Sequence, residues 1–207
     1  VLGLHSEDVR FSADGAEAFA PYSHSTQTAV FAFEELPLAW GRISLGARME
    51  SVQVTSSGNP QVARFVPASR SFNPHSVALG VLWNARTDWQ LTSNLAYTER
   101  APKDYELFAN GPHLATNAYE VGNSQFGVEQ STNLDLGLKW KQGANSFQLS
   151  AFANQFNNYV SQRATGVLRD TDGNGSDGVG VTDDGNGLSV ESGGSASVLP
   201  EYVYTQI

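Results

Sequence analysis

Hydrophobic and polar residues alternate one by one along much of this chain. Between 131 and 141, a leucine stands at every second position from Leu134 to Leu138 and Trp140 follows, with polar residues or glycine between them. A period of two is typical of a β-strand that has one apolar face. The same alternation predicts other strands over 26–35, 43–54, 77–84, 89–98 and 147–159, and a further one that begins at 201. The pattern therefore predicts an all-β chain of roughly seven strands, the last one cut short.

The connections between these strands alternate between short and long. Short turns are expected over 37–42, 87–88 and 142–145, and long connections over 55–74, 99–130 and 161–200. Every long connection then lies at one end of the sheet, for which a soluble β-sandwich gives no reason. An outer-membrane barrel has long outer loops and short periplasmic turns. The alternation favours an antiparallel meander that forms part of a large transmembrane β-barrel.

The positions of the four tryptophans support this interpretation. Trp40, Trp83, Trp89 and Trp140 all lie in or beside the short turns, and so at one end of the predicted sheet. Indole rings prefer the membrane–water boundary, where the ring is buried and its N–H stays hydrated. Tyr97 lies eight residues beyond Trp89 on the same strand face. That separation projects to ~20 Å, close to the ~25 Å apolar band of a barrel.

Composition narrows the range of functions. The 207 residues include no cysteine, and 12 basic against 21 acidic residues give a net charge of −9. This balance disfavours nucleic acid as a partner, because neutralising phosphates needs clusters of basic residues. No apolar run approaches the ~20 residues of a membrane-spanning helix. The chain has no Gly-x-Ser-x-Gly motif, no His-Glu-x-x-His motif and no cysteine nucleophile, so we predict no enzymatic activity.

Several motifs follow one another within residues 98–140. The chain reads E-R-A-P from 99, E-L-F from 106, Y-E-V-G-N from 119 and E-Q-S-T-N-L-D-L-G from 129. In this order and spacing they resemble the barrel signature of TonB-dependent outer-membrane receptors. The run N-G-P-H-L-A-T from 110 is similar to the subgroup associated with zinc or metal-chelate uptake. Ser124-Gln125-Phe126 stands where the family has a Pro-x-Leu turn, so that turn is altered here.

The resemblance implies a function as well as a fold. It implies a receptor in the outer membrane of a Gram-negative bacterium that imports a scarce metal ion or metal chelate, such as a siderophore, haem or zinc. Import would be energised through the TonB complex, and the partners would be the ligand, that complex and outer-membrane lipid. The family's plug domain and energy-coupling box are not identified in this chain, which we therefore expect to be a piece of a longer protein.

His113 is the candidate for contact with a substrate. It lies within the family-like connection, with Asp104, Tyr105, Glu106 and Glu120 near it in sequence. Imidazole and carboxylate groups together form the type of ligand set that zinc prefers. Because the spacing between His113 and the acids fits no compact local metal motif, transient contact with a substrate is predicted. The alternative is an ordinary solvated loop histidine.

The same connection contains residues that suit a structural role. Glu99, Arg100 and Glu129 lie at strand ends, where charged side chains can anchor a long loop through charge-assisted hydrogen bonds. Pro102 and the following segment 104–108 predict one helical turn, because proline is favoured at an early helical position. Such a turn would stiffen the connection over the pore.

An acidic, glycine-rich stretch begins at Asp170. Asp170, Asp172 and Asn174 match the start of a calcium-binding loop, and Asp177 is a further oxygen donor. The bidentate glutamate that an EF-hand needs at the twelfth position is Val181 here, which contradicts an EF-hand. An exposed Gly/Asp surface loop is the preferred interpretation, and a looser calcium site is the alternative.

This acidic stretch also suits a competing class of protein. A secreted, soluble β-sandwich that binds calcium or a glycan through its acidic loop would contain the same strands. The two classes differ in the surroundings of Leu136 and Leu138. A barrel exposes such residues to lipid, whereas a sandwich buries them against a second sheet.

Overall fold

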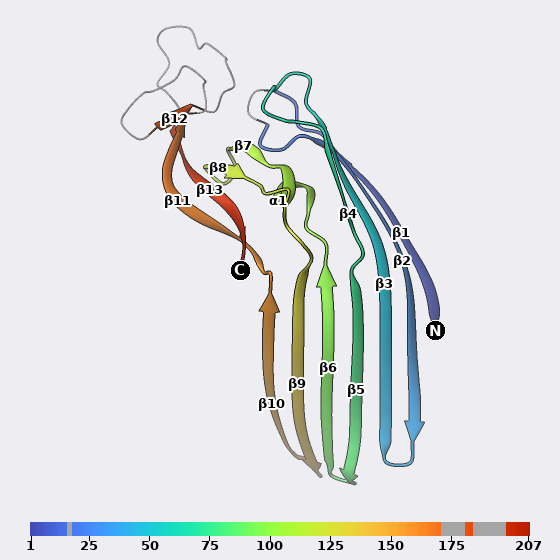
Figure 1. Cartoon of the computed structure of the whole chain (residues 1–207). Coiled ribbons are helices and arrows are strands. Elements are labelled where there is room, and N and C mark those ends of the chain that lie inside the picture. The colour runs from blue at the N-terminus through green and yellow to red at the C-terminus, as the bar shows by residue number, and fades with distance from the viewer. Residues whose placement is uncertain (16–17, 171–180, 184–197) are drawn as a thin grey trace.

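The computed structural model describes residues 1–15, 18–170, 181–183 and 198–207, and its main feature is a large antiparallel sheet (Figure 1). Seven strands follow one another in the order β1-β2-β3-β5-β6-β9-β10, and the short strand β4 pairs with β3. These strands are β1 (Leu2–Phe11), β2 (Tyr22–Leu38), β3 (Gly41–Gly58), β4 (Ala68–Phe72), β5 (His75–Arg86), β6 (Trp89–Arg100), β9 (Glu129–Gln142) and β10 (Asn145–Asn157). All neighbours in this sheet are antiparallel, which confirms the predicted meander.

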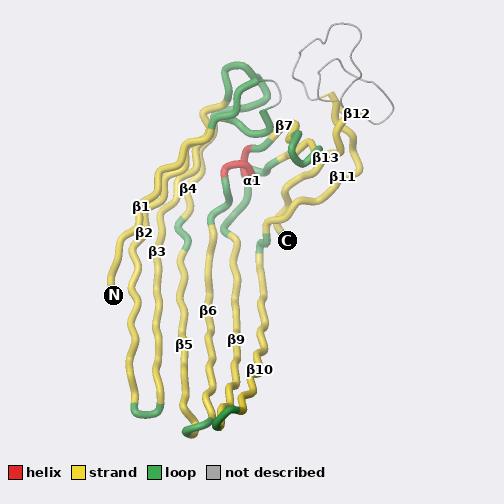
Figure 2. Tube along the Cα trace, turned by 180° about the vertical axis from the view of Figure 1, so that it is seen from behind, coloured by secondary structure: helices red, strands yellow, loops and turns green. Residues whose placement is uncertain are grey.

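A smaller sheet and one helical turn gather at one end of the large sheet (Figure 2). The elements are α1 (Asp104–Phe108), β7 (Asn110–His113), β8 (Ala118–Val121), β11 (Val160–Asp170), β12 (Val181–Asp183) and β13 (Val198–Gln206). Their sheet order is β12-β11-β13-β8-β7. β8 runs parallel to β13, so the connection between β6 and β9 is hydrogen-bonded to the last strand of the chain. Among the described residues, no helix is long and apolar enough to cross a membrane.

The turns that join β2 to β3, β5 to β6 and β9 to β10 lie at the opposite end (Figure 1). The indole rings gather there, as the sequence predicted. Trp89 and Trp140 are cross-strand partners with ring centroids 6.3 Å apart. Trp83 pairs with Gly41, next to Trp40 in the first turn. One end of the sheet therefore carries a belt of tryptophan.

The two faces of the large sheet differ in chemistry. Leu45, Leu79, Leu95 and Leu134 are cross-strand partners and form one apolar row. Their exposed fractions range from 36 to 48%, so no second sheet covers them. Leu136 on the same face is 49% exposed. This exposure overturns the alternative of a β-sandwich, because a sandwich would bury these side chains between two sheets. We call this surface the outer face.

The opposite surface, which we call the inner face, is mostly polar. It includes the cross-strand partners Ser44, Gly80, Asn94 and Asp135. Farther along β3, the guanidinium of Arg48 donates to the carboxylate of Glu50 at 2.6 Å on the same face. An apolar surface backed by a polar one is the arrangement of a barrel wall between lipid and a watery interior.

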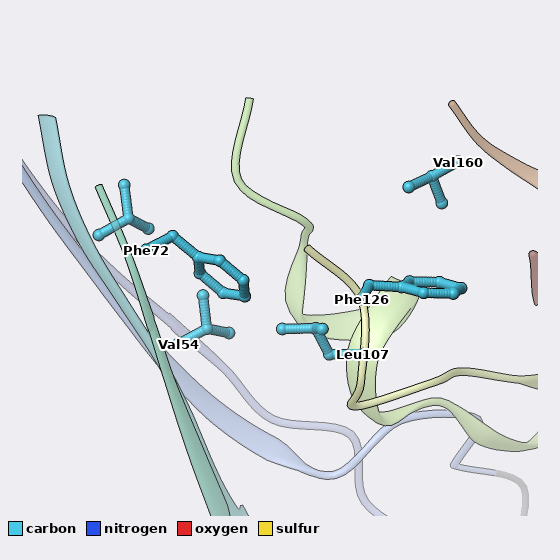
Figure 3. Packing of buried hydrophobic residues seen from close by; sticks show 6 residues of the cluster. Val54, Phe72, Leu107, Phe126 and Val160 are labelled. Carbon is cyan, nitrogen blue, oxygen red and sulfur yellow. The ribbon is translucent and has the colours of Figure 1, made fainter. Parts of the chain in front are cut away.

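Near the end with the long connections, the inner face becomes apolar and is covered. Val52 and Val54 of β3 continue the inner face, and Leu107 of α1 packs against them (Figure 3). The buried cluster consists of Val52, Val54, Phe72, Leu107, Phe126 and Val160. The predicted helical turn after Pro102 is therefore present as α1. It fixes the 99–130 connection on the inner side of the wall.

All three long connections predicted from the sequence contain strands: β7 and β8 lie within 99–130, and two other stretches also contain strands. β3 continues to Gly58 and pairs with β4, inside the predicted connection 55–74. β11 begins at Val160 and pairs with β13, inside the predicted connection 161–200. Both stretches are polar at most positions. One face of β3 is covered by other segments here, and a polar residue such as Ser56 is buried on it. Burial therefore does not require an apolar residue at every second position, and the periodicity that revealed the other strands is absent here.

The outer face predicts how charged substitutions will act in the full-length protein. Leu136→Arg places a charge about 10 Å inside the tryptophan belt and should lower the free energy of unfolding in phospholipid vesicles by about 2 kcal/mol. The matched control Asp135→Arg puts the same side chain on the inner face and should change it by less than about 0.5 kcal/mol. Denaturant titration measures both values, and equal losses would contradict the assignment of the faces.

Candidate ligand-binding site

An arginine holds together the long connection between β6 and β9. The guanidinium of Arg100, at the end of β6, donates to Glu106 of α1 at 2.9 and 3.2 Å. It also donates to Glu129, at the start of β9, at 3.2 and 3.3 Å. Both carboxylates are largely buried. The three residues come from three of the sequence motifs, so the motifs meet in one ion-pair cluster. Arg100 and Glu129 were expected to anchor the loop, whereas Glu106 was predicted to contact substrate.

The Gly-Asn motif docks on the same helical turn. The backbone N–H of Asn123 donates to the carbonyl oxygen of Glu106 at 2.9 Å, and that of Gly122 donates to Ala109 at 2.7 Å. A Cβ atom at Gly122 would lie 2.8 Å from the carbonyl carbon of Leu107. Only glycine therefore allows the chain to pass so close to α1. The altered residues after Asn123 still form a turn, because Phe126 N–H donates to the Asn123 carbonyl.

This anchored connection carries the hairpin of β7 and β8, which brings His113 and Glu120 together. Nδ1 of His113 lies 2.7 Å from a carboxylate oxygen of Glu120. The hairpin turns at Asn117, which has a φ of 52°, a left-handed conformation that asparagine tolerates. The ring of Phe19 stacks on the imidazole with centroids 4.2 Å apart and planes 9° apart. The imidazole of His113 is thus held by Phe19 against one face of the ring and by Glu120 at Nδ1.

Glu120 is the buried centre of this arrangement, with an exposed fraction of only 2%. The hydroxyl of Tyr204 donates to it at 2.8 Å and that of Thr116 at 3.2 Å. Burial raises the pKa of Glu120, but the hydrogen bonds from His113 and Tyr204 outweigh burial, so the pKa lies below its ordinary value. Burial and the bond to Glu120 raise the pKa of Tyr204. Glu120 is therefore an anion that accepts from all three groups.

The second nitrogen of the imidazole, Nε2, is available to a ligand. Within the part of the chain that the structure describes, Nε2 of His113 makes no hydrogen bond, and the side chain is 30% exposed. A carboxylate at Nδ1 fixes the tautomer and orientation of an imidazole that binds a metal through its other nitrogen. The pair therefore has the form of a histidine ligand with its supporting carboxylate.

The other residues singled out in the sequence are engaged elsewhere. Asp104 accepts a hydrogen bond from Ser23, and Glu106 belongs to the Arg100 cluster. The ring of Tyr105 lies 6.0 Å from that of Tyr204. Among the described residues, no three His, Asp or Glu side chains are grouped so as to hold a metal ion. His113 and Glu120 are the two that the structure brings together.

Only one residue of the calcium hypothesis lies within the described part of the chain. Asp170 is the last residue of β11, and Asp172, Asn174 and Asp177 lie outside the described residues.

Two residues of the site lie far from the motifs, and the sequence did not identify them. Phe19 comes from the connection between β1 and β2, and Tyr204 from β13. Tyr204 reaches Glu120 because β13 runs beside β8, where Glu201 pairs with Tyr119. Alternation in 201–207 predicted a strand, but no local pattern identifies the strand beside which it lies.

A wall of antiparallel strands with an apolar outer face, a polar inner face and ordered connections at one end is the architecture of a section of a transmembrane β-barrel. Residues 6–207 match the family described as "TonB dependent receptor-like, beta-barrel", and the chain belongs to that family. The resemblance to this receptor family and the predicted fold class are thereby confirmed, whereas the similarity of 110–116 to the zinc or metal-chelate subgroup stays a prediction. The family implies a location in the outer membrane of Gram-negative bacteria, and it comprises transport receptors.

Two solved structures are similar to this chain. One is a double mutant of the Serratia marcescens hemophore receptor HasR in complex with its hemophore HasA and heme, with 13% identity and a TM-score of 0.64. The match covers 94% of this chain and 31% of HasR. The other is the siderophore receptor PirA from Pseudomonas aeruginosa, with 16% identity, a TM-score of 0.43, and coverage of 78% and 40%. The chain thus spans about a third of the length of HasR, and the likeness to HasR shows the fold alone.

The ion-pair cluster predicts a specific loosening of the long connection. Arg100→Gln leaves Glu106 and Glu129 largely buried without a cation, which should lower the free energy of local opening by about 2 kcal/mol, because Arg100 is itself 37% exposed. Limited proteolysis of the full receptor should then cut within 101–128. Arg163→Gln is the matched control, because Arg163 is exposed. Equal cleavage of the two variants would contradict the role of Arg100.

The lowered pKa of Glu120 predicts a pH dependence of the hairpin. A carboxylate whose pKa is depressed by folding adds stability that is fully present above its ordinary pKa of ~4.3 and is lost as the pH falls through the depressed value. Hydrogen-exchange protection of 118–121 should therefore be constant from neutral pH to about pH 5 and fall in more acidic solution. Glu120→Gln should flatten this profile. An unchanged profile in that variant would assign the dependence to another group.

Proposed function

We propose that this chain is part of an outer-membrane active transporter that captures a metal chelate and is energised through TonB. The single observation that carries the proposal is the His113–Glu120 pair, with Nδ1 and the carboxylate 2.7 Å apart. The pair lies on the hairpin at the end of the wall opposite the short turns. In a family member that end is the outer one, because the short turns of such barrels are periplasmic.

The donor set favours a chelated metal over a bare ion. Zinc held by protein alone takes three or four protein ligands, and the described residues offer no such group. A single imidazole nitrogen suits a metal whose other positions are filled by its chelator. Haem is such a cargo, because its iron keeps axial positions that histidine binds. A siderophore that fills all positions of its iron would not use His113 in this way.

The aromatic residues around the pair fit a flat cargo. Phe19 stacks on His113, and the rings of Tyr105 and Tyr204 lie close by on the side of Glu120. Extended π-surfaces give large contact area for planar ligands. In this proposal Tyr105 contributes to cargo contact, whereas Asp104 and Glu106 act through the position of α1.

The inner face would provide the passage beyond the capture site. Arg48, Glu50, Asn94, Asp135 and Lys139 lie on this face by their cross-strand register. They would keep the interior wet and polar, while the outer-face leucines contact lipid. Movement of cargo would depend on TonB acting through parts of the receptor outside this chain.

Haem titration of the full receptor, followed by the Soret absorption band, tests the proposal. His113→Ala should weaken binding by about 100-fold, because the metal loses its protein ligand, and Glu120→Gln by about 10-fold, because the imidazole loses its support. His24→Ala, which removes a histidine paired with Asp8 in the wall, should leave binding unchanged.

Uptake measurements extend the same test to transport. The double variant His113→Ala with Glu120→Ala should lose haem-dependent growth while the receptor remains folded in the membrane. Unchanged uptake of every metal source by that variant would refute capture at this pair.

A further inference from the structure

The ring that covers one face of His113 comes from a distant connection. Phe19 lies between β1 and β2, and its neighbours Ala18 and Ala20 are both buried. Besides stacking on His113, the ring of Phe19 makes an edge contact with Phe11, with centroids 6.1 Å apart. The position of this short segment therefore decides how the imidazole is covered.

The segment approaches the backbone of β7 closely. The N–H of Asn110 donates to the carbonyl oxygen of Phe19 at 2.9 Å. A Cβ atom at Gly111 would lie 2.4 Å from the carbonyl oxygen of Ala18 and 2.9 Å from the Cα of Phe19. Only glycine therefore allows the two segments to lie so near each other. A backbone hydrogen bond alone would still let them pivot about it.

Arg64 supplies a second tie, and it comes from a third connection, the one between β3 and β4. Its Nε donates to the carbonyl oxygen of Asn110, and its Nη2 donates to that of Ala18 at 2.7 Å. A planar guanidinium holds two acceptors in a fixed relation, which a flexible ammonium cannot do. Arg64 thus joins the residue before Phe19 to the start of the strand that ends at His113.

The guanidinium is itself held in place. It lies over the ring of Phe65, 4.9 Å from the centroid. Phe65 and Val62 pack with Ala18 in a buried cluster, so the connection that carries Arg64 also cradles the segment that carries Phe19. Three connections therefore meet at this one side chain.

We propose that Arg64 is a positioning residue for the imidazole of His113 and acts through Phe19. By fixing Ala18 against Asn110, it keeps the ring of Phe19 parallel to the imidazole and Nε2 directed toward the cargo. The inference rests on the proposed function in so far as His113 receives a metal chelate. The control of His113 by Arg64 is independent of the cargo and can be measured without it.

Modification of His113 by diethyl pyrocarbonate in the full, cargo-free receptor, followed by mass spectrometry, tests this chain of contacts. Phe19→Ala uncovers the imidazole and should speed modification roughly two- to tenfold, the factor to which a stacked aromatic pair corresponds. Arg64→Gln should give a similar increase. The double variant should show no further increase, because effects that pass through a shared contact are not additive. Arg64→Lys, which can reach one carbonyl but not both, should lie between wild type and Arg64→Gln.

Arg70→Gln is the matched control. Arg70 also lies over a neighbouring ring, that of Phe72 at 5.3 Å, and also donates to a backbone carbonyl, that of Phe126 at 3.0 Å. Its contacts belong to the core around α1, so the modification rate of His113 should stay at the wild-type value. An equal increase in Arg70→Gln would indicate general loosening and overturn the proposal. An unchanged rate in Arg64→Gln, or multiplied increases in the double variant, would overturn it as well.

Haem titration then connects the positioning role to capture. Arg64→Gln should weaken binding by about tenfold, and the same substitution in the Phe19→Ala background should add little. Normal haem binding by Arg64→Gln, with binding still lost in His113→Ala, would overturn the role of Arg64 alone. Normal binding by His113→Ala would instead overturn the proposed function, and the modification rates would still decide whether Arg64 positions the imidazole.

Discussion

Backbone hydrogen bonding across the strand ladder is the constraint on which the rest of this structure depends. Hydrocarbon offers no partner to an N–H or C=O group, so a membrane wall must satisfy each of them from a neighbouring strand. Along the order β1-β2-β3-β5-β6-β9-β10, each strand of the large sheet is paired with its neighbour in this way. Because the ladder satisfies the backbone without help from side chains, one face is free to be apolar and the other polar. The exposed leucine row and the polar inner face both follow from that freedom.

The same constraint explains how much of the fold the sequence could predict. Where one face meets hydrocarbon, the alternation is strict, and the strand predicted over 131–141 is β9, Glu129–Gln142. Beyond the apolar band the inner face packs against connecting segments, in part through polar residues such as Ser56, and the alternation fades. β4 and β11 lie in that region and were assigned to connections. The alternation of apolar and polar residues ends at the edge of the apolar band, although the strands continue beyond it.

The candidate site was predictable only where it is local. One connection and its flanking strands contain Arg100, Glu106 and Glu129, so the motifs were sufficient to predict an anchored loop. His113 and Glu120 are seven residues apart on one hairpin. Phe19 and Tyr204 come from opposite ends of the chain, and only the pairing of distant strands brings them in. The motifs shared with the family build the support of the hairpin, whereas His113, which would touch cargo, lies between them. The motifs therefore identify the family more readily than its ligand.

The parallel pairing of β8 with β13 has a consequence for the order of assembly. Glu120 and Tyr204 are 84 residues apart in the chain, so their hydrogen bond cannot form until β13 has been made and placed beside β8. Contacts of such long sequence separation form late, because closing the intervening chain costs entropy first. While the wall assembles, the β7–β8 hairpin therefore lacks its pairing with β13. A receptor whose chain stopped before β13 would lack the hydrogen bond from Tyr204 to Glu120.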